Sequence, residues 1–215
     1  MKIGVFDSGI GGLSVAKAIQ RALPDFEIVF RDDREHLPYG TRTPEDLLGL
    51  VAPILEDMIV QGCQVIVIAC NTVSTTIAPV LREKFSIPFI AMEPMIKPAA
   101  ALTKTKVIAV CATPATLGSK RYQWLKDTYA QGIRVVEPDC SEWAAMIEHN
   151  NIDDSKISDN VELILKEQAD VIVLGCTHYH WIEEKIKDMV RGRAQVIQPE
   201  QPVIEQLKRV IAQLS

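Results

Sequence analysis

A strand-like segment that ends in a cysteine occurs twice in this chain, and this repeat limits the fold more than any other feature. Residues 64–72 (QVIVIACNT) resemble residues 170–178 (DVIVLGCTH), 106 positions further on. Residues 2–8 (KIGVFDS) are echoed by residues 106–112 (KVIAVCA), at an offset of 104. Val-Ile-Val runs are common in buried strands, so one match has little weight. Two matches at nearly one offset indicate two related halves.

The pattern between the repeats is that of an α/β fold. Continuous apolar runs at 2–6 and 65–69 predict buried strands, and helical periodicity follows each of them, at 13–23 and through Val73, Ile77, Val80 and Leu81. Thr43-Pro44 predicts a helix start. Strands of this kind separated by helices predict a parallel sheet covered on both faces. We therefore expect two similar α/β domains related by pseudo-twofold symmetry, 1–96 and 97–197, with residues 198–215 packing back on the first.

Composition excludes several classes of protein. No apolar run approaches the ~18 residues of a membrane span, and a net charge of −5 argues against a nucleic-acid or anionic-membrane surface. The five cysteines are an odd number, and the chain opens on MKIGVFD, which does not resemble a secretory leader. We therefore expect free thiols in a reducing compartment, the cytoplasm, and an enzyme or a binding protein.

Two of the cysteines are candidates for chemistry. Cys70 and Cys176 each follow a predicted strand, where ligands of parallel α/β sheets bind, and each stands at a predicted helix start, which favours the reactive thiolate. One such cysteine is usually a small buried apolar residue. Two equivalent ones, facing each other across a cleft, suit a reaction in which one removes a proton from a carbon and the other delivers a proton to its opposite face.

The neighbouring polar residues allow several interpretations. Asp7 ends the first strand and could assist one thiol, and His178 would lie on the same side as Cys176 if the backbone stays extended. The loop Gly9-Ile10-Gly11-Gly12 is compatible with carboxylate binding by its N–H groups and equally with a tight turn. Zinc is disfavoured because Cys176-Thr177-His178 lacks the usual ligand spacing. A redox protein is disfavoured because no Cys-x-x-Cys occurs.

At this point the sequence resembles the aspartate/glutamate racemase family. The matching blocks are residues 6–13 (FDSGIGGL), 38–40 (PYG), 69–72 (ACNT) and 175–179 (GCTHY), with weaker matches at 93–98 and 113–116 (TPAT). They stand in family order and cover residues 1 to about 180. The resemblance implies racemisation of glutamate by two bases, without metal or other cofactor, supplying D-glutamate for peptidoglycan. The implied partner is this small substrate, with no nucleic acid or membrane, in a homodimer.

The resemblance also implies roles for individual residues. Cys70 would act on the D-isomer and Cys176 on the L-isomer, with Asp7, His178 and Glu148 as auxiliary groups. The substrate would be held by Asp7, Ser8, Tyr39, Gly40, Asn71, Thr72, Thr113, Thr116, Thr177 and His178. Glu148 is assigned from its position eight residues after Cys140, in a block where Ser141 replaces the usual proline.

Two further departures from the family pattern leave alternatives open. His180-Trp181 replaces the usual Pro-Leu and would alter packing or the entrance of the site. Family members usually continue about 35 to 50 residues further, so stability, dimer contacts or activity would differ here. The alternatives are a relative that acts on aspartate and a short family member that binds glutamate with little catalysis.

Overall fold

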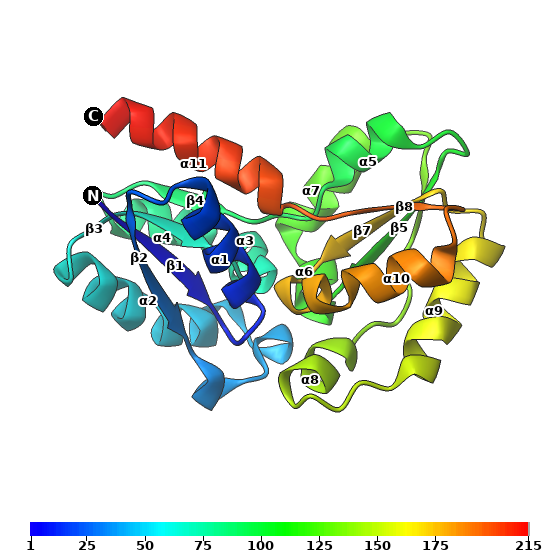
Figure 1. The fold of residues 1–215 in the computed structure, drawn as a ribbon, viewed down its shortest axis with the longest axis horizontal. Helices are drawn as coiled ribbons and strands as arrows, with labels where there is room; N and C mark the ends of the chain where they lie inside the picture. Colours follow the sequence, from blue (N-terminus) through cyan, green and yellow to red (C-terminus); the bar gives the residue numbers. More distant parts are fainter. Residues whose placement is uncertain (215) are drawn as a thin grey trace.

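The computed structural model describes residues 1–214 as two α/β units side by side (Figure 1). The first unit contains a parallel sheet in the order β2-β1-β3-β4, and the second a parallel sheet in the order β6-β5-β7-β8. The strands are β1 (Lys2–Asp7), β2 (Glu27–Asp32), β3 (Cys63–Ile68), β4 (Phe89–Ala91), β5 (Val107–Ala112), β6 (Arg134–Val136), β7 (Val171–Gly175) and β8 (Gln195–Ile197). The repeated segments form β1 and β3 in one sheet and β5 and β7 in the other, at equivalent central places. The expected fold class of two similar α/β units is confirmed.

Helices cover both faces of each sheet. The first unit holds α1 (Gly12–Ala22), α2 (Pro44–Val60), α3 (Asn71–Thr76), α4 (Ala78–Lys84) and the 3-10 turns η1 (Arg34–His36) and η2 (Tyr39–Thr41). The second holds α5 (Ile96–Leu102), α6 (Pro114–Gly118), α7 (Lys120–Tyr129), α8 (Trp143–Glu148), α9 (Asp154–Lys166), η3 (Thr177–Ile182) and α10 (Glu183–Val190). The apolar residues of the strands point alternately into two cores, one on each side of the sheet.

The last helix, α11 (Glu200–Leu214), returns to the first unit after β8 (Figure 1). Val203, Ile204, Leu207 and Ile211 on this helix belong to the same buried cluster as strand and α1 residues of the first sheet. The chain therefore passes between the units twice, after β4 and after β8. The domain boundaries of 1–96 with 198–215, and 97–197, stay a proposal, and Ile96 itself packs in the core of the second unit; Ser215 lies outside the described residues.

The structure corrects one detail of the helix prediction. The helix expected through Val73 and Val80 is two helices, because α3 ends at Thr76 and α4 begins at Ala78. Pro79 lies in the first turn of α4, where its missing N–H interrupts an α-helical ladder continued from α3. The side chain of Val80 is 43% exposed and does not join the core.

Candidate active site

A cavity of about 820 Å³ lies between the two units, beyond the carboxyl ends of the central strands. Both units contribute to its lining, which includes eleven of the residues expected at the site: Ser8, Tyr39, Gly40, Cys70, Asn71, Thr72, Thr113, Glu148, Cys176, Thr177 and His178. Asp7 and Thr116 do not line the cavity, and both are fully buried beside it. The sheet topology thus brings residues together that are more than 100 positions apart in the chain.

Cys70 is held as a buried thiol at the start of α3. Its side chain is almost fully buried, and its Sγ lies 3.4 Å from the hydroxyl of Ser8. Burial, and then the nearby charge of Asp7, raise the pKa of Cys70 to about 12, although the contact with Ser8 acts in the opposite direction. The expectation that a helix start would favour the thiolate is wrong for this cysteine, because desolvation outweighs the helix.

Cys176 has a different neighbour. Its Sγ lies 3.9 Å from Nδ1 of His178, and Nε2 of that histidine lies 2.7 Å from Oε2 of Glu148. The expected extended backbone is not found: η3 begins at Thr177, directly after Cys176, and its turn brings His178 back toward the sulfur. The three side chains form one line of contacts from the thiol to a carboxylate.

The His178–Glu148 pair is strongly ionic. Burial alone would lower the pKa of His178, but hydrogen bonds to Cys176 and Glu148 raise it to about 10. Burial alone would raise the pKa of Glu148, but His178, the N–H of Ile10 and Arg34 together lower it to about 2. At neutral pH, Glu148 is therefore a carboxylate and His178 an imidazolium, which places a positive charge beside Cys176.

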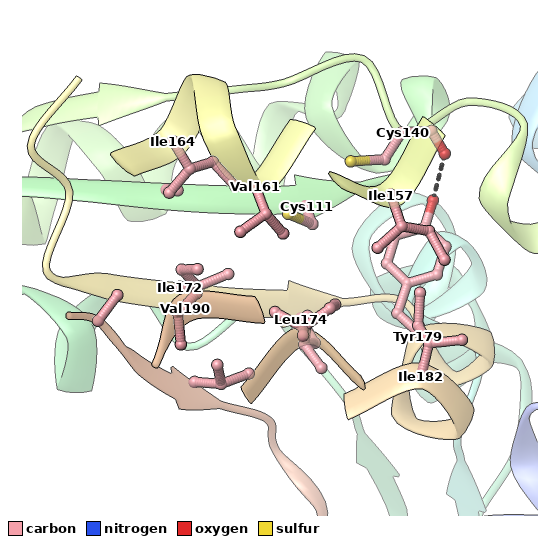
Figure 2. Packing of buried hydrophobic residues seen from close by; sticks show 14 of the residues in the cluster. Cys111, Cys140, Ile157, Val161, Ile164, Ile172, Leu174, Tyr179, Ile182 and Val190 are labelled. Atoms are coloured by element: carbon pink, nitrogen blue, oxygen red, sulfur yellow. Dashed lines mark hydrogen bonds between the residues drawn. The ribbon is translucent and has the colours of Figure 1, made fainter. Parts of the chain in front are cut away.

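Packing between α8 and η3 sets the geometry of this pair. Trp143, in the first turn of α8, meets the ring of Tyr179 on η3 edge-on at 5.2 Å. The Tyr179 hydroxyl donates to the carbonyl of Cys140 at 2.7 Å, as Figure 2 shows. Both rings are fully buried. Because Glu148 ends α8 and His178 lies on η3, this contact holds the carboxylate and the imidazole in register.

Asp7 connects the two units beneath the cavity. One carboxylate oxygen accepts the N–H of Gly9 at 2.9 Å, and the other accepts the hydroxyl of Thr177, in the second unit, at 2.7 Å. Burial raises the pKa of Asp7, whereas the positive charge of His178 and the two hydrogen bonds act in the opposite direction. Asp7 therefore influences Cys70 through its charge, and its oxygens are occupied by protein groups.

The glycine-rich loop is explained by the close approach of the two units. A Cβ on Gly9 would lie 2.5 Å from Oε2 of Glu148, and one on Gly11 would lie 2.6 Å from the backbone nitrogen of His178. The N–H of Ile10 donates to Glu148 at 3.0 Å. Of the two interpretations of this loop, carboxylate binding occurs, but the carboxylates are those of Asp7 and Glu148.

The remaining polar residues form the wall of the cavity. The Thr72 and Thr113 hydroxyls, one from each unit, lie 3.0 Å apart. The hydroxyl of Thr116 contacts that of Thr113, so Thr116 supports the wall without lining the cavity. Tyr39 donates to Asp33 at 2.5 Å. The amide nitrogen of Asn71 donates to a backbone carbonyl, whereas its buried Oδ1 has no protein partner.

Residues 1–214 contain no group of three His, Cys, Asp or Glu side chains that could hold a metal ion. In the same range, the structure has no helix both long and apolar enough to cross a membrane.

Comparison with known proteins shows the family of this chain. Residues 3–207 match the family described as Asp/Glu/Hydantoin racemase. The chain belongs to this family. A glutamate racemase of Herpetosiphon aurantiacus is 38% identical over 98% of this chain and 84% of its own length, and one of Ectopseudomonas mendocina is 35% identical over 98% and 82%. The expectation of a racemase is confirmed at the level of the family.

Solved structures of family members have the same fold. Escherichia coli glutamate racemase, in complex with L-glutamate and the activator UDP-MurNAc-Ala, superposes with a TM-score of 0.91 at 27% identity, covering 98% of this chain and 82% of that one. A glutamate racemase of Francisella tularensis in complex with D-glutamate gives 0.83 at 28% identity, covering 99% and 81%.

At positions 180 and 181, where the family resemblance leads us to expect Pro-Leu, the chain has His180 and Trp181. Nδ1 of His180 lies 3.3 Å from the hydroxyl of Ser14 on α1, which is a polar contact between the units. Burial, with the positive charge of His178, lowers the pKa of His180 to about 4. Trp181 is about half exposed, with the Lys17 ammonium 5.8 Å from its ring. Neither residue lines the cavity, and both instead contact residues of α1.

Sequence reasoning missed Arg34 and Asp33. Arg34 lines the cavity and lies 2.8 Å from Glu148, and Asp33 accepts from Tyr39. Both belong to the run RDDREH at 31–36, a pattern typical of a solvated loop. The one usable signal is position, because this run stands one residue before the PYG block.

Proposed function

We propose that this protein interconverts L- and D-glutamate without a cofactor, by proton transfer between Cα and the thiols of Cys70 and Cys176. The observation that carries the proposal is that the two cysteines line one cavity from equivalent strand ends of two similar units. Two acid/base groups on opposite sides of one carbon are what inversion of a stereocentre requires.

The two thiols have different electrostatic environments. The raised pKa of Cys70, about 12, keeps it a neutral thiol that can donate a proton. Cys176 lies beside the imidazolium of His178, whose positive charge faces the sulfur that would accept the proton. In the L-to-D direction, Cys176 takes the Cα proton, the bond electrons remain on the substrate as a carbanion, and Cys70 delivers its proton to the opposite face. The D-to-L direction reverses these roles.

The polar wall of the cavity fits an amino acid with two carboxylates. Hydroxyls of Ser8, Thr72 and Thr113 can donate to carboxylate oxygens, and the free Oδ1 of Asn71 is an acceptor suited to an ammonium group. We infer that the substrate ammonium contacts Asn71, because an acceptor buried without a partner is costly until a donor reaches it.

The proposal makes a first prediction about isotope exchange. In D2O, either enantiomer of glutamate should gain deuterium at Cα and racemise in the presence of the purified protein. The variants Cys70→Ser and Cys176→Ser should each lower kcat by about 10²-fold or more, because each removes one of the two proton carriers. Cys63→Ala is the matched control and should retain activity, since Cys63 is buried in the first core away from the cavity.

The same assay separates the alternatives. Exchange with aspartate in preference to glutamate would assign the site to the other amino acid of the family description, and glutamate binding without exchange would indicate a protein that has lost catalysis. Full activity in the double variant Cys70→Ser/Cys176→Ser would contradict the two-thiol mechanism.

The cellular role follows from the family resemblance and is part of the proposal. The D-glutamate would supply peptidoglycan synthesis in the cytoplasm, and the active form would be a homodimer. Expression of this chain should restore growth of a bacterial strain that requires added D-glutamate, and the variant Cys176→Ser should not.

A further inference from the structure

Arg34 lies at the start of η1 in the first unit and reaches across to the second. Its Nε is 2.8 Å from Oε1 of Glu148, and 3.6 Å from Oδ2 of Asp32 behind it. The side chain of Glu148 is only 8% exposed, whereas that of Arg34 is 53% exposed. The ion pair therefore forms a bridge across the cavity, with its carboxylate end buried.

The two oxygens of Glu148 are used by different partners. Oε1 faces Arg34, while Oε2 accepts the N–H of Ile10 and meets Nε2 of His178. Arg34 and Ile10 both belong to the first unit, whereas Glu148 and His178 belong to the second. The carboxylate that orients His178 is thus itself oriented by the opposite unit.

We propose that Arg34 is a positioning residue for proton transfer at Cys176, acting through Glu148 and His178 when the two units are closed on each other. The inference rests on the proposed function, in particular on Cys176 acting on the L-isomer. Arg34 does not touch the reacting carbon in this scheme. Arg34 holds the Glu148 carboxylate in place. That carboxylate in turn holds the His178 imidazole next to the Cys176 thiol.

The other groups around Glu148 would keep it ionised without Arg34, so the role left to Arg34 is to orient this carboxylate. Glu148 also faces His178 and, more remotely, Asp7, while His178 faces Cys176, Asp7 and the neutral His180. If Arg34 were removed, His178 and the N–H of Ile10 would still hold Glu148 ionised at neutral pH. Removing Arg34 would therefore misplace the imidazole of His178. It would also raise the pKa of Glu148, so the fall in rate at acid pH would begin at a higher pH.

Kinetic isotope effects test this inference because the reaction has two proton transfers. The transfer at Cys176 comes first for L-glutamate and second for D-glutamate. A variant that slows only this transfer should raise the primary isotope effect on kcat/KM with L-[2-²H]glutamate and lower the effect with D-[2-²H]glutamate. Damage to the site as a whole would not move the two effects in opposite directions.

The variants are Arg34→Ala, Arg34→Lys and the control Arg31→Ala. Because Arg34 is half exposed, we expect Arg34→Ala to lower kcat by roughly three- to tenfold with KM nearly unchanged, and less at high salt. Arg34→Lys should recover part of the loss. Arg31 is an exposed arginine of the same unit that pairs with Asp57 outside the cavity, so Arg31→Ala should behave as the wild type.

Three outcomes would overturn the inference. A rise in KM with unchanged kcat would make Arg34 a ligand of a substrate carboxylate. Parallel changes in both isotope effects would make it a general structural residue. Unchanged kcat, KM and isotope effects would give it no role. An inactive wild-type protein would refute the proposed function and this inference with it. An active wild type with unchanged isotope effects in Arg34→Ala would refute the inference alone.

Discussion

Two cysteines at equivalent places in the repeat have different immediate neighbours. Cys70 faces the Ser8 hydroxyl and the charge of Asp7, whereas Cys176 faces the imidazole of His178. The backbone repeat is symmetrical, but the electrostatic surroundings of the two sulfurs are not. The sequence predicts the positions of both thiols, because each follows an apolar strand. The raised pKa of Cys70 depends on burial and on Asp7, which strand pattern alone does not reveal.

The pairing of Glu148 with Arg34 shows the limit of sequence reasoning at this scale. The family resemblance assigns Glu148. His178 is singled out because it stands two residues after Cys176. Arg34 stands among charged residues at 31–36, and its partner is 114 positions away. Charge runs in loops mostly face solvent, so only the packing of the two units distinguishes this arginine from its neighbours.

The pKa of His178 predicts how stability depends on pH. Its value in the folded protein, about 10, lies above the ordinary 6.5, so folding favours the protonated ring. The stability that this ring contributes is fully present below pH 6.5 and is lost as pH rises toward 10. Urea unfolding from pH 6.5 to 9 should show a declining free energy of unfolding in the wild type and a flatter profile in His178→Asn. Equal slopes would show that His178 gains no proton affinity on folding.

At the level of elements, sequence pattern identifies the inner strands well and the outer ones poorly. β1, β3, β5 and β7 are nearly continuous apolar runs because helices cover both of their faces. β4, β6 and β8 have three residues each, and β2 is only partly buried, so their patterns are too short or too mixed to predict a strand. The break between α3 and α4 escapes sequence reasoning because apolar periodicity continues through Pro79.

Helix α11 is the element whose packing can be tested most directly. Leu207 is fully buried against the first core, whereas Leu214, near the end of the same helix, is 45% exposed. Leu207→Ala should lower the free energy of unfolding by about 2–5 kcal/mol, because it leaves a cavity between the helix and the sheet. Leu214→Ala should change it by no more than about 0.5 kcal/mol. Urea titrations of the two variants make the comparison, and equal costs would show that α11 is not anchored by its buried face.

For the whole molecule, the cavity belongs to neither unit alone. Ser8, Cys70 and Thr72 come from the first unit, and Thr113 and Cys176 from the second, while the Asp7–Thr177 and Arg34–Glu148 contacts join the units around it. A ligand that fills this cavity would therefore contact both units. The repeat in the sequence predicts two units that face each other, but the contacts that close them depend on loops between the repeated segments.

Substrate binding should therefore stabilise the folded protein as one body. Glutamate at ten times its Kd should add about 1.4 kcal/mol to the free energy of unfolding. Differential scanning calorimetry should show the transition of both units move to higher temperature together. A shift confined to one of two separate transitions would show that the ligand binds a single unit.

The return of α11 to the first sheet also has a consequence for the order of events at the ribosome. The second unit, from α5 to β8, is one uninterrupted stretch and has all its elements as soon as β8 is made. The first unit begins to emerge earlier, yet the face of its sheet that α11 covers waits until the second unit has been synthesised. Domains usually complete folding in the order of synthesis. In this protein the unit that starts first is the one that finishes last, and its apolar face stays open to chaperones in the interval.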